Sequence, residues 1–391
     1  MSQGMSQVAG PKPSSTARVA LVLGSLQAGG AERVMTLLAG EWAEQGRSVT
    51  LLTFGSASDP DFFHVDARVK RIHLDVFRVV WNPVKGTNSV RQVVTLRRAL
   101  ARVAPDVVIS FIVETNVLTL IATRGTGLPV VVSDRVDPSM DQVTRGWRIL
   151  RRLLYPRATS VVEQTEAARA FFPQHARRRI RVIPNPVPAP PLSKPGRSAD
   201  APNRRIVALG RLHPQKGFDL LLRAFSEVHQ EHPDWTLEIW GEGGERPALE
   251  RLVSDLSLER FVRLPGLTTA PYDVLRSADL FVMSSRREGF PNALCEAMTC
   301  GLPVVSFDCP SGPGEIIRNG IDGLLVPPED TVELARAMGR LMSSAAERER
   351  LSLRAIEIVE RFSVPRVMAQ WDQVIDEAVA ASRHVNRPPA R

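Results

Sequence analysis

The stretch RRIVALGRLHPQKGFDLLLRAF, residues 204–225, carries the clearest local pattern in the chain. Its apolar run Ile206–Leu209 ends at a glycine, which predicts a buried parallel strand. Phe218–His229 then repeats apolar residues at helical spacing and ends before a proline, which predicts an α-helix. The loop between them holds two cations, Arg211 and Lys216. The stretch therefore predicts one strand–loop–helix unit of a parallel α/β sheet.

The same alternation continues on both sides of this stretch. Downstream, strands are predicted at Leu237–Trp240, Leu280–Met283 and Pro303–Phe307, with a helix at Pro247–Leu256. Upstream, strands are predicted at Val19–Leu23, Val49–Phe54, Val107–Phe111 and Val130–Ser133, with helices through Val34, Leu37, Leu38 and Trp42 and at Val90–Val103. This alternation predicts an α/β fold of two doubly wound parallel sheets with helices on both faces. In such sheets, ligands bind beyond the carboxyl ends of the strands, and two facing sheets form a cleft.

The length and one Pro-rich segment divide the chain into domains. A chain of 391 residues suits two domains, and PNPVPAPPLSKPGRSADAPN (184–203) is too Pro-rich for a helix or a central strand. Two helical stretches follow the second sheet, at about Thr331–Phe362 and Pro365–Ser382. The predicted organisation is a disordered tail at 1–17, a first domain at 18–185, a linker at 186–203 and a second domain at 204–364, with helix 365–382 returning to the first domain.

The composition is that of a cytoplasmic globular protein. Hydrophobic residues make up 43% and charged residues 24%, no apolar run is long enough to span a membrane, and the N-terminus has no signal-like apolar region. The three cysteines include no CxxC pair, which argues against a disulfide framework or a zinc site. Asp59-Pro60-Asp61 lies in a polar loop and is interpreted as a turn, so no catalytic metal is expected.

The formal net charge of +8 is unevenly distributed. Residues 1–200 hold 27 Lys/Arg and 15 Asp/Glu, a net +12, whereas the remainder holds 23 and 27, a net −4. This asymmetry indicates either a polyanionic partner of the first half or arginines spread over solvated helices. The stretch TRGWRILRRLLYPR (144–157) poses the same choice, because it fits an interfacial helix at an anionic membrane or an ordinary domain helix. Both alternatives stay open at this point.

A second motif, EGFPNALCE (288–296), follows the predicted strand Leu280–Met283. Pro291-Asn292 can open a helix that Gly301 closes, which places Glu288 before the helix and Glu296 about one turn inside it. A carboxylate accepts from two hydroxyls at once, which suits Glu296 to a ribose diol and Glu288 to sugar hydroxyls. The two cations of the earlier loop, beside a helix N-terminus, suit a diphosphate held without metal.

Together these motifs resemble the retaining glycosyltransferases of the GT-B architecture, specifically the large group 1, or family 4-like, enzymes that use nucleotide-diphospho-sugars. The resemblance covers nearly the whole chain and rests on ordered motifs: GGAERV (29–34), VIPNPV (182–187), the GRL–QKG loop, WGEG (240–243), EGFPNALCE and SGPGEIIRNGIDGLLVPPED (311–330).

The resemblance implies a role for each matching residue. Arg211 and Lys216 would bind and stabilise the departing diphosphate, and with Glu288 they form the predicted catalytic set. Further donor contacts are implied at Gly29, Gly30, Leu264, Leu267, Thr268, Gly289, Phe290, Pro291, Asn292, Ala293, Leu294 and Glu296. Among them, the loop around Leu264–Thr268 would contact the base of the nucleotide. Related enzymes retain the anomeric configuration and need no enzyme nucleophile, so no cofactor or metal is expected beyond a UDP- or GDP-sugar donor.

The first domain departs from the pattern. Several relatives place a histidine beyond a central strand, whereas Val107–Phe111 runs into IVETN without one. Polar residues at the ends of two first-domain strands are therefore the candidates for contact with the acceptor or are ordinary loop residues: Glu114, Asn116, Asp134 and Arg135.

The functional hypothesis is a hexosyltransferase that acts on a glycan or lipid-linked acceptor in polysaccharide or glycoconjugate synthesis. It is expected in the cytoplasm, with peripheral contact to the inner face of the cell membrane as an open possibility. Two alternatives are a GT-B-like sugar-nucleotide epimerase or phosphorylase, and a non-catalytic binder of anions or nucleic acid. The low aromatic content, 6%, argues against nucleic acid as a partner.

Overall fold

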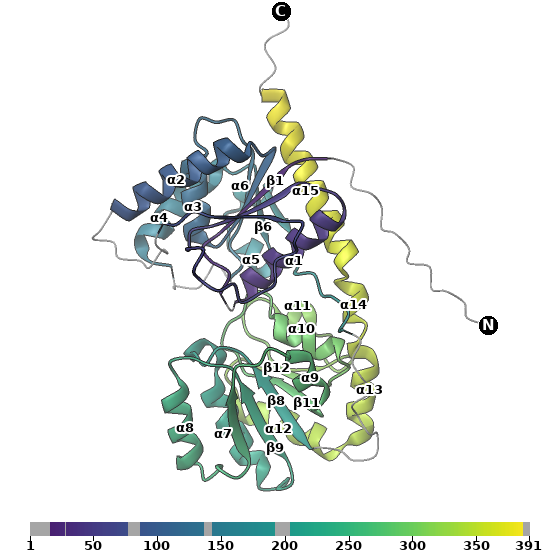
Figure 1. Cartoon of the computed structure of the whole chain (residues 1–391). Helices are drawn as coiled ribbons and strands as arrows, with labels where there is room; N and C mark the ends of the chain where they lie inside the picture. The colour runs from purple at the N-terminus through teal and green to yellow at the C-terminus, as the bar shows by residue number, and fades with distance from the viewer. Residues whose placement is uncertain (1–15, 28, 77–86, 137–142, 192–203, 386–391) are drawn as a thin grey trace, which may run out of the picture. The chain divides into compact units, whose positions relative to one another are not determined.

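The computed structural model describes residues 16–27, 29–76, 87–136, 143–191 and 204–385. The predicted tail, except residues 16 and 17, and the predicted linker from residue 192 onward lie outside the described residues. The chain forms two compact units (Figure 1). Unit 1 comprises residues up to 163, 169–183 and from 364 onward, and unit 2 comprises 164–168 and 184–363. Because each unit has its own sheet and core, the two are described separately.

Unit 1 is built on a seven-stranded parallel sheet with the order β3-β2-β1-β4-β5-β6-β7. Its strands are β1 (Val19–Leu23), β2 (Val49–Thr53), β3 (Lys70–His73), β4 (Val107–Phe111), β5 (Val130–Ser133), β6 (Ser160–Glu163) and β7 (Ile180–Val182). Its helices are α1 (Gly30–Glu44), α2 (Thr87–Val103), α3 (Val113–Ala122), α4 (Arg145–Leu154), η1 (Tyr155–Arg157), α6 (Gln174–Arg177) and α15 (Val364–Val385), and α5 (Glu166–Ala170) spans the boundary with unit 2.

Strand β1 is apolar throughout because it is buried on both faces of the sheet. Val19 and Leu21 pack into the core formed with α1 and α15, whereas Ala20 and Val22 pack into the core formed with α2 and α3. Figure 1 shows these helix pairs on opposite faces of the sheet. A central parallel strand is buried on both faces, so it shows no polar alternation.

The last helix, α15, completes the core of unit 1. Trp371 is fully buried and makes an edge contact with Trp42 of α1, at 6.3 Å between ring centroids. Asp372 accepts hydrogen bonds from Trp42 Nε1 (2.9 Å) and Arg47 Nη2 (3.0 Å). The end of the chain therefore packs on its beginning, within one unit.

Unit 2 is built on a six-stranded parallel sheet with the order β10-β9-β8-β11-β12-β13. Its strands are β8 (Arg205–Leu209), β9 (Thr236–Trp240), β10 (Val262–Gly266), β11 (Leu280–Met283), β12 (Val304–Phe307) and β13 (Leu324–Val326). Its helices are η2 (Pro214–Lys216), α7 (Phe218–His229), α8 (Arg246–Asp255), α9 (Pro271–Arg276), α10 (Asn292–Thr299), α11 (Pro313–Ile316), α12 (Thr331–Ser343), α13 (Ala345–Ala355) and α14 (Ile358–Arg361). The predicted pair of doubly wound parallel sheets is confirmed.

One predicted helical stretch differs from the structure. Residues 331–362 form three helices rather than one, because the first ends at Ser343 and Ser344 starts the next. The Ser344 hydroxyl accepts a hydrogen bond from Glu347 N (3.2 Å), so this side chain caps the second helix.

No helix in the described part of the chain combines the length and the apolar character needed to cross a bilayer.

Candidate active site

The site in unit 2 lies where the order of its strands reverses. β8 and β11 are neighbours in the sheet, but β9 and β10 extend from one of them and β12 and β13 from the other. At such a switch point the loops that leave the two strands diverge and open a crevice at the carboxyl edge of the sheet. The loop after β8 is 210–217 and the loop after β11 is 284–291. The two strongest sequence motifs therefore meet at the position where this fold binds ligands.

A lysine and a glutamate from these two loops are in direct contact. Lys216 Nζ lies 2.6 Å from Glu288 Oε1, and the Ser285 hydroxyl donates to the same oxygen at 2.6 Å. The Glu288 side chain is 8% exposed and that of Lys216 is 23% exposed, so the ammonium faces both the carboxylate and solvent. Within the described residues, the second carboxylate oxygen, Glu288 Oε2, accepts no hydrogen bond. The pair thus presents a fixed cation and a fixed acceptor side by side.

Further hydrogen bonds join the two loops. Ser284 Oγ donates to Lys216 O (3.0 Å), and Gln215 Nε2 donates to Arg287 O (2.9 Å). Arg286 binds Asp219, the second residue of α7, through two bonds of 2.8 and 2.7 Å. Partial burial opposes ionisation of Asp219, but the hydrogen bonds and charge of Arg286 outweigh it and lower the Asp219 pKa. These contacts fix the position of Lys216 relative to Glu288.

Arg211 occupies the same loop but has a different environment. Its side chain is exposed, and among the described residues it has no hydrogen bond or ion pair. An arginine without a protein partner beside a fixed lysine can still bind an anion through its planar set of donors. The loop therefore carries one cation held in place and one available cation.

Helix α10 begins next to this pair. Pro291 is its N-cap residue, and the first bond of the helix runs from Cys295 N to Pro291 O (3.2 Å). The N–H groups of Asn292, Ala293 and Leu294 precede that bond, so they have no acceptor within the helix and can serve an anion. The Phe290 ring is buried against Phe362 at 5.4 Å, which leaves only its backbone for ligand contact. Glu296 lies one turn inside the helix and is 7% exposed.

Two glycines, Gly241 of the WGEG motif and Gly217 before α7, allow the backbone to pack closely at the carboxyl edge of the sheet. Gly241 has φ +144°, and a Cβ added there would lie 1.8 Å from Gly210 O in the loop of Arg211. Gly217, with φ +61°, precedes α7, and a Cβ there would lie 2.0 Å from Ser284 O. Both positions require glycine, because the obstructing atoms belong to the backbone.

Replacing Gly241 by alanine is expected to lower the free energy of unfolding of unit 2 by about 2–3 kcal/mol, through backbone strain and the clash with Gly210. Gly244, three residues later, is the matched control, because a Cβ there meets nothing within 4 Å. Urea unfolding of both variants measures the difference. Equal stability of Gly241→Ala and Gly244→Ala would contradict the proposed close packing.

The segment 264–268, which the sequence predicts to be a base-binding loop, is only partly a loop in the structure. Leu264 is not in a loop: it lies in strand β10, half-buried, and packs against the main core of unit 2. Leu267, 61% exposed, and Thr268 do lie in the following loop. Leu264 is thus placed to stabilise the edge strand, and the loop candidates reduce to the other two residues.

In unit 1 the order of strands reverses between β1 and β4. Gly29 and Gly30 follow β1 at the start of α1, and Glu114 follows β4 in the first turn of α3. Burial raises the pKa of the Glu114 carboxyl, with a smaller contribution from the charge of Asp134. These three residues lie at the carboxyl edge of the unit 1 sheet, as the sequence predicts.

Asn116 and Asp134, in contrast, belong to a buried polar cluster. Both are fully buried; Asn116 Nδ2 donates to Ser133 O (2.9 Å), and Tyr155 OH donates to Asp134 Oδ1. Arg151 Nη1 of α4 donates to Asp134 Oδ2 (3.2 Å). Side chains buried and engaged in this way are not accessible to an acceptor, so the cluster instead fastens α3, β5 and α4 together.

Arg135 is also buried, at 7% exposure, with its guanidinium 4.4 Å from the centroid of the Phe111 ring. Burial lowers the pKa of Arg135 to about 9, while the charge of Glu163 opposes this shift. Its φ of +60° shows that the chain bends sharply after β5. Arg135 therefore lies against an aromatic ring of the unit 1 core, and its contact with an acceptor stays a prediction.

The Asp59-Pro60-Asp61 segment behaves as a turn. Asp59 Oδ2 accepts from Ser56 N (2.9 Å), and Asp61 pairs with Arg71 (3.1 Å). Across the described residues, no three His, Cys, Asp or Glu side chains gather as a set of metal ligands.

Two family models match the chain, one on each sheet. The model described as glycosyl transferases group 1 matches residues 203–344, and the model described as glycosyl transferase 4-like domain matches residues 29–186. The chain belongs to the glycosyl transferases group 1 family. It is a glycosyltransferase, and its relatives act in the synthesis of polysaccharides and glycoconjugates.

The share of each relative's length that this glycosyltransferase matches varies widely. It is 24% identical over 361 residues to an N-acetylgalactosaminyltransferase of Campylobacter jejuni that acts on a diphospho-undecaprenol-linked glycan, covering 92% of this chain and 98% of the relative. It is 34% identical over 208 residues to a lipopolysaccharide core biosynthesis glycosyltransferase of Rhizobium meliloti, covering 52% and 59%. An exopolysaccharide phosphotransferase of Streptomyces coelicolor is 31% identical over 294 residues, 73% of this chain, but the chain spans only 30% of that longer relative.

Solved structures show the fold of this glycosyltransferase. Sucrose-phosphate synthase from Thermosynechococcus elongatus matches with a TM-score of 0.79 and 20% identity, covering 93% of this chain and 100% of that one. Anabaena HepE, solved with UDP, matches with a TM-score of 0.73 and 20% identity, covering 92% and 99%. The GT-B fold, with two Rossmann-like domains, is thereby confirmed.

Sequence reasoning missed the residues that organise this glycosyltransferase site. Ser285, Arg286 and Asp219 received no role, although they position Glu288 and the loop of Lys216. The sequence SSRRE contained one indication, because an arginine soon after a buried strand is often partly buried and then pairs with a carboxylate, as Arg286 does with Asp219.

Proposed function

We propose that this glycosyltransferase moves a hexose-type sugar from a nucleotide-diphospho-sugar to a glycan or lipid-linked acceptor, with retention of the anomeric configuration. The single observation that carries the proposal is the contact of Lys216 Nζ with Glu288 Oε1, 2.6 Å, at the strand reversal of unit 2. This contact places a cation that can bind the diphosphate next to a carboxylate that can bind the sugar. The diphosphate and the sugar are the two groups that separate when the donor is cleaved.

Lys216 acts on the leaving group. An ammonium has three N–H donors; one is used by Glu288, so two remain for diphosphate oxygens. Arg211 adds a second cation, and the α10 N-terminus adds backbone donors with a positive dipole end. The Lys216 ammonium and the end of α10 are fixed before the bond breaks, so they stabilise the developing negative charge without reorganisation and without a metal ion.

The carboxylates orient the sugar nucleotide. Glu288 Oε1 is occupied by Lys216 and Ser285, so Oε2 is the oxygen that would accept from a donor-sugar hydroxyl. Glu296, one turn inside α10, is assigned to the ribose diol, and the loop of Leu267 and Thr268 to the base. The acceptor can then attack from the face of the leaving group, which retains configuration and needs no enzyme nucleophile.

The comparisons support a uridine donor and a lipid-linked acceptor. Anabaena HepE and the pneumococcal transferase GtfA were solved with UDP, and the Campylobacter jejuni relative acts on a diphospho-undecaprenol-linked glycan. We therefore favour a UDP-sugar over a GDP-sugar. As a separate proposal, the reaction takes place in the cytoplasm, with the enzyme in contact with the inner face of the cell membrane.

A thermal-shift screen of UDP-, GDP- and ADP-sugars in EDTA tests the proposal. A bound donor stabilises the folded state by mass action, by about 2.7 kcal/mol when the donor is present at a hundred times its Kd. We expect UDP-sugars to raise the melting temperature most, and EDTA to leave both the shift and turnover unchanged. Absence of a shift with every donor would overturn the nucleotide-sugar assignment, and strict dependence on Mn²⁺ would overturn the metal-free chemistry.

A further inference from the structure

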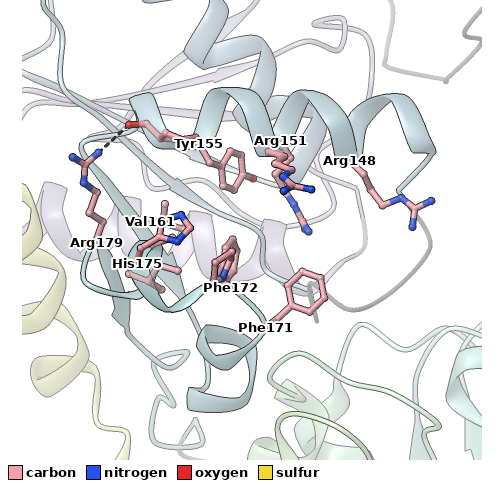
Figure 2. A pocket seen from close by; sticks show the side chains of 13 residues that line it. Arg148, Arg151, Tyr155, Val161, Phe171, Phe172, His175 and Arg179 are labelled. Atoms are coloured by element: carbon pink, nitrogen blue, oxygen red, sulfur yellow. Dashed lines mark hydrogen bonds between the residues drawn. The ribbon is translucent and has the colours of Figure 1, made fainter.

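Unit 1 contains a pocket that none of the assigned roles uses. Its volume is about 720 Å³, which is within the usual range for a small-molecule site. Helix α4 supplies one wall, β6 and β7 contribute Val161 and Ile180, and the segment 171–179 supplies the facing wall. Figure 2 shows Arg148 and Arg151 on α4, with Phe171, Phe172 and His175 on the segment that faces them.

The pocket lies in the most basic part of the chain. Residues 145–181 contain ten arginines and two glutamates, a net charge of +8 that equals the formal net charge of the whole protein. Arg148, Arg151, Arg152 and Arg179 line the pocket, and no acidic residue does so among the described residues. Such a concentration of one charge in a concave site attracts anions strongly.

Only part of this charge is neutralised locally. Arg151 pairs with the buried Asp134, whereas Arg179 donates to an uncharged acceptor, Pro156 O, at 3.0 Å. Arg152 is exposed and has no hydrogen bond or ion pair with any described residue. The arginine guanidinium suits phosphate, because its planar donors bind two oxygens together.

Helix α4 and the facing wall of the pocket also expose apolar side chains. Of the ten residues of α4, only Trp147 is buried, and Ile149 and Leu153 are 52% and 61% exposed. Phe171, on the facing wall, is 49% exposed, with the Arg151 guanidinium 5.5 Å from its ring centroid. The helix thus turns Trp147 and part of Leu154 inward, and leaves Ile149 and Leu153 exposed to solvent. Large apolar side chains left in water beside a cationic pocket indicate a ligand that covers both.

We propose that this pocket binds the phosphate or diphosphate of a long-chain alcohol, with its head group on the arginines and the first part of its chain on Phe171 and Phe172. A free phosphate would leave the apolar wall uncovered, and a neutral lipid would leave the arginines without a counterion. The proposal rests on the proposed function only in taking this ligand to be the lipid-linked acceptor.

Calorimetric titration of the full chain with dodecyl phosphate, below its micelle concentration, tests the pocket directly. Inorganic phosphate and dodecyl maltoside are the two comparison ligands. Each supplies only one half of the proposed ligand, so we expect both to bind at least roughly tenfold more weakly than dodecyl phosphate. Inorganic phosphate binding as tightly would show a free-phosphate site, and dodecyl maltoside binding as tightly would show a general detergent surface; either result overturns the proposal.

Two variants locate the binding. Arg152→Glu and Phe171→Ser are each expected to weaken dodecyl phosphate binding by roughly tenfold, with unchanged melting temperatures. Matched controls are Arg98→Glu on α2, exposed and outside the pocket, and Leu353→Ser on α13, where the leucine is 65% exposed. The proposal fails if the pocket variants bind like the wild type, or if the controls lose as much affinity.

A third variant separates this proposal from the proposed function. Lys216→Ala alters only the site of unit 2, so its binding of dodecyl phosphate should equal that of the wild type. Lost transfer with retained binding supports both proposals. Retained transfer by Lys216→Ala with the same binding would contradict the donor chemistry and leave the pocket standing.

Discussion

Replacing Lys216 by alanine is expected to lower the turnover number by roughly a hundred- to a thousandfold, the loss typical when one fixed donor to developing negative charge is removed. Its ammonium is held by Glu288 at 2.6 Å and stays 23% exposed, so it can meet the diphosphate directly. The release of nucleoside diphosphate from the donor found in the screen measures the effect. Arg223→Ala, which removes an exposed cation from α7 of the same unit, should leave turnover unchanged.

The same substitution also leaves the buried Glu288 carboxylate with one partner fewer. We expect Lys216→Ala to cost about 1–2 kcal/mol of stability, less than for a fully buried pair, because Lys216 is partly solvated. Adding Glu288→Gln removes that uncompensated charge, so the double variant should regain stability without regaining activity. If activity returned together with stability, Lys216 would have a structural role and its assignment to the diphosphate would be wrong.

Replacing Trp371 by alanine is expected to lower the free energy of unfolding of unit 1 by about 3–5 kcal/mol, the usual cost of emptying a buried aromatic site. Trp371 is fully buried and lies between Trp42 and Phe111, at 6.3 and 6.0 Å between ring centroids. Loss of the indole therefore opens a cavity between α15, α1 and β4. Urea unfolding followed by circular dichroism measures the change.

Two milder variants test the reason for that loss. The Trp371 indole N–H is buried and has no hydrogen-bond partner among the described residues, so Trp371→Phe should cost far less than alanine. Gln373→Ala changes an exposed position on the same helix and should alter stability by about 0.5 kcal/mol or less. A similarly small effect of Trp371→Ala would mean that α15 does not complete the core of unit 1.

The sheets were predictable because buried parallel strands are continuous apolar runs. Val19–Leu23, Val107–Phe111 and Leu280–Met283 have the same bounds in the sequence and in the structure. Helix α3 was not predictable in this way, because eight of its ten residues are buried and it has no polar face. Strand β10 contains Pro265, which argues against a strand, but β10 lies at the edge of the sheet, where proline is tolerated.

The sequence was enough to predict which residues form the site, but not which of their side chains are in contact. The carboxyl ends of neighbouring parallel strands lie at the same edge of a doubly wound sheet. Topology alone therefore predicts that the residues after β8 and β11 lie near one another: Arg211, Lys216 and Glu288. The direct contact between Lys216 and Glu288 joins residues 72 positions apart and depends on loop conformations that sequence spacing does not encode. Asn116 and Asp134 failed as acceptor candidates for a related reason, since polar residues at strand ends can face a ligand or a buried tyrosine equally well.

The central claim is that Lys216 holds the diphosphate of the sugar donor. Calorimetric titration of UDP and uridine, in EDTA, into the wild type and Lys216→Ala tests it most directly. In the wild type, UDP should bind far more tightly than uridine, and in the variant this advantage should fall at least roughly tenfold, as a lost hydrogen bond to a charged group implies. An unchanged advantage of UDP over uridine in Lys216→Ala would contradict the account.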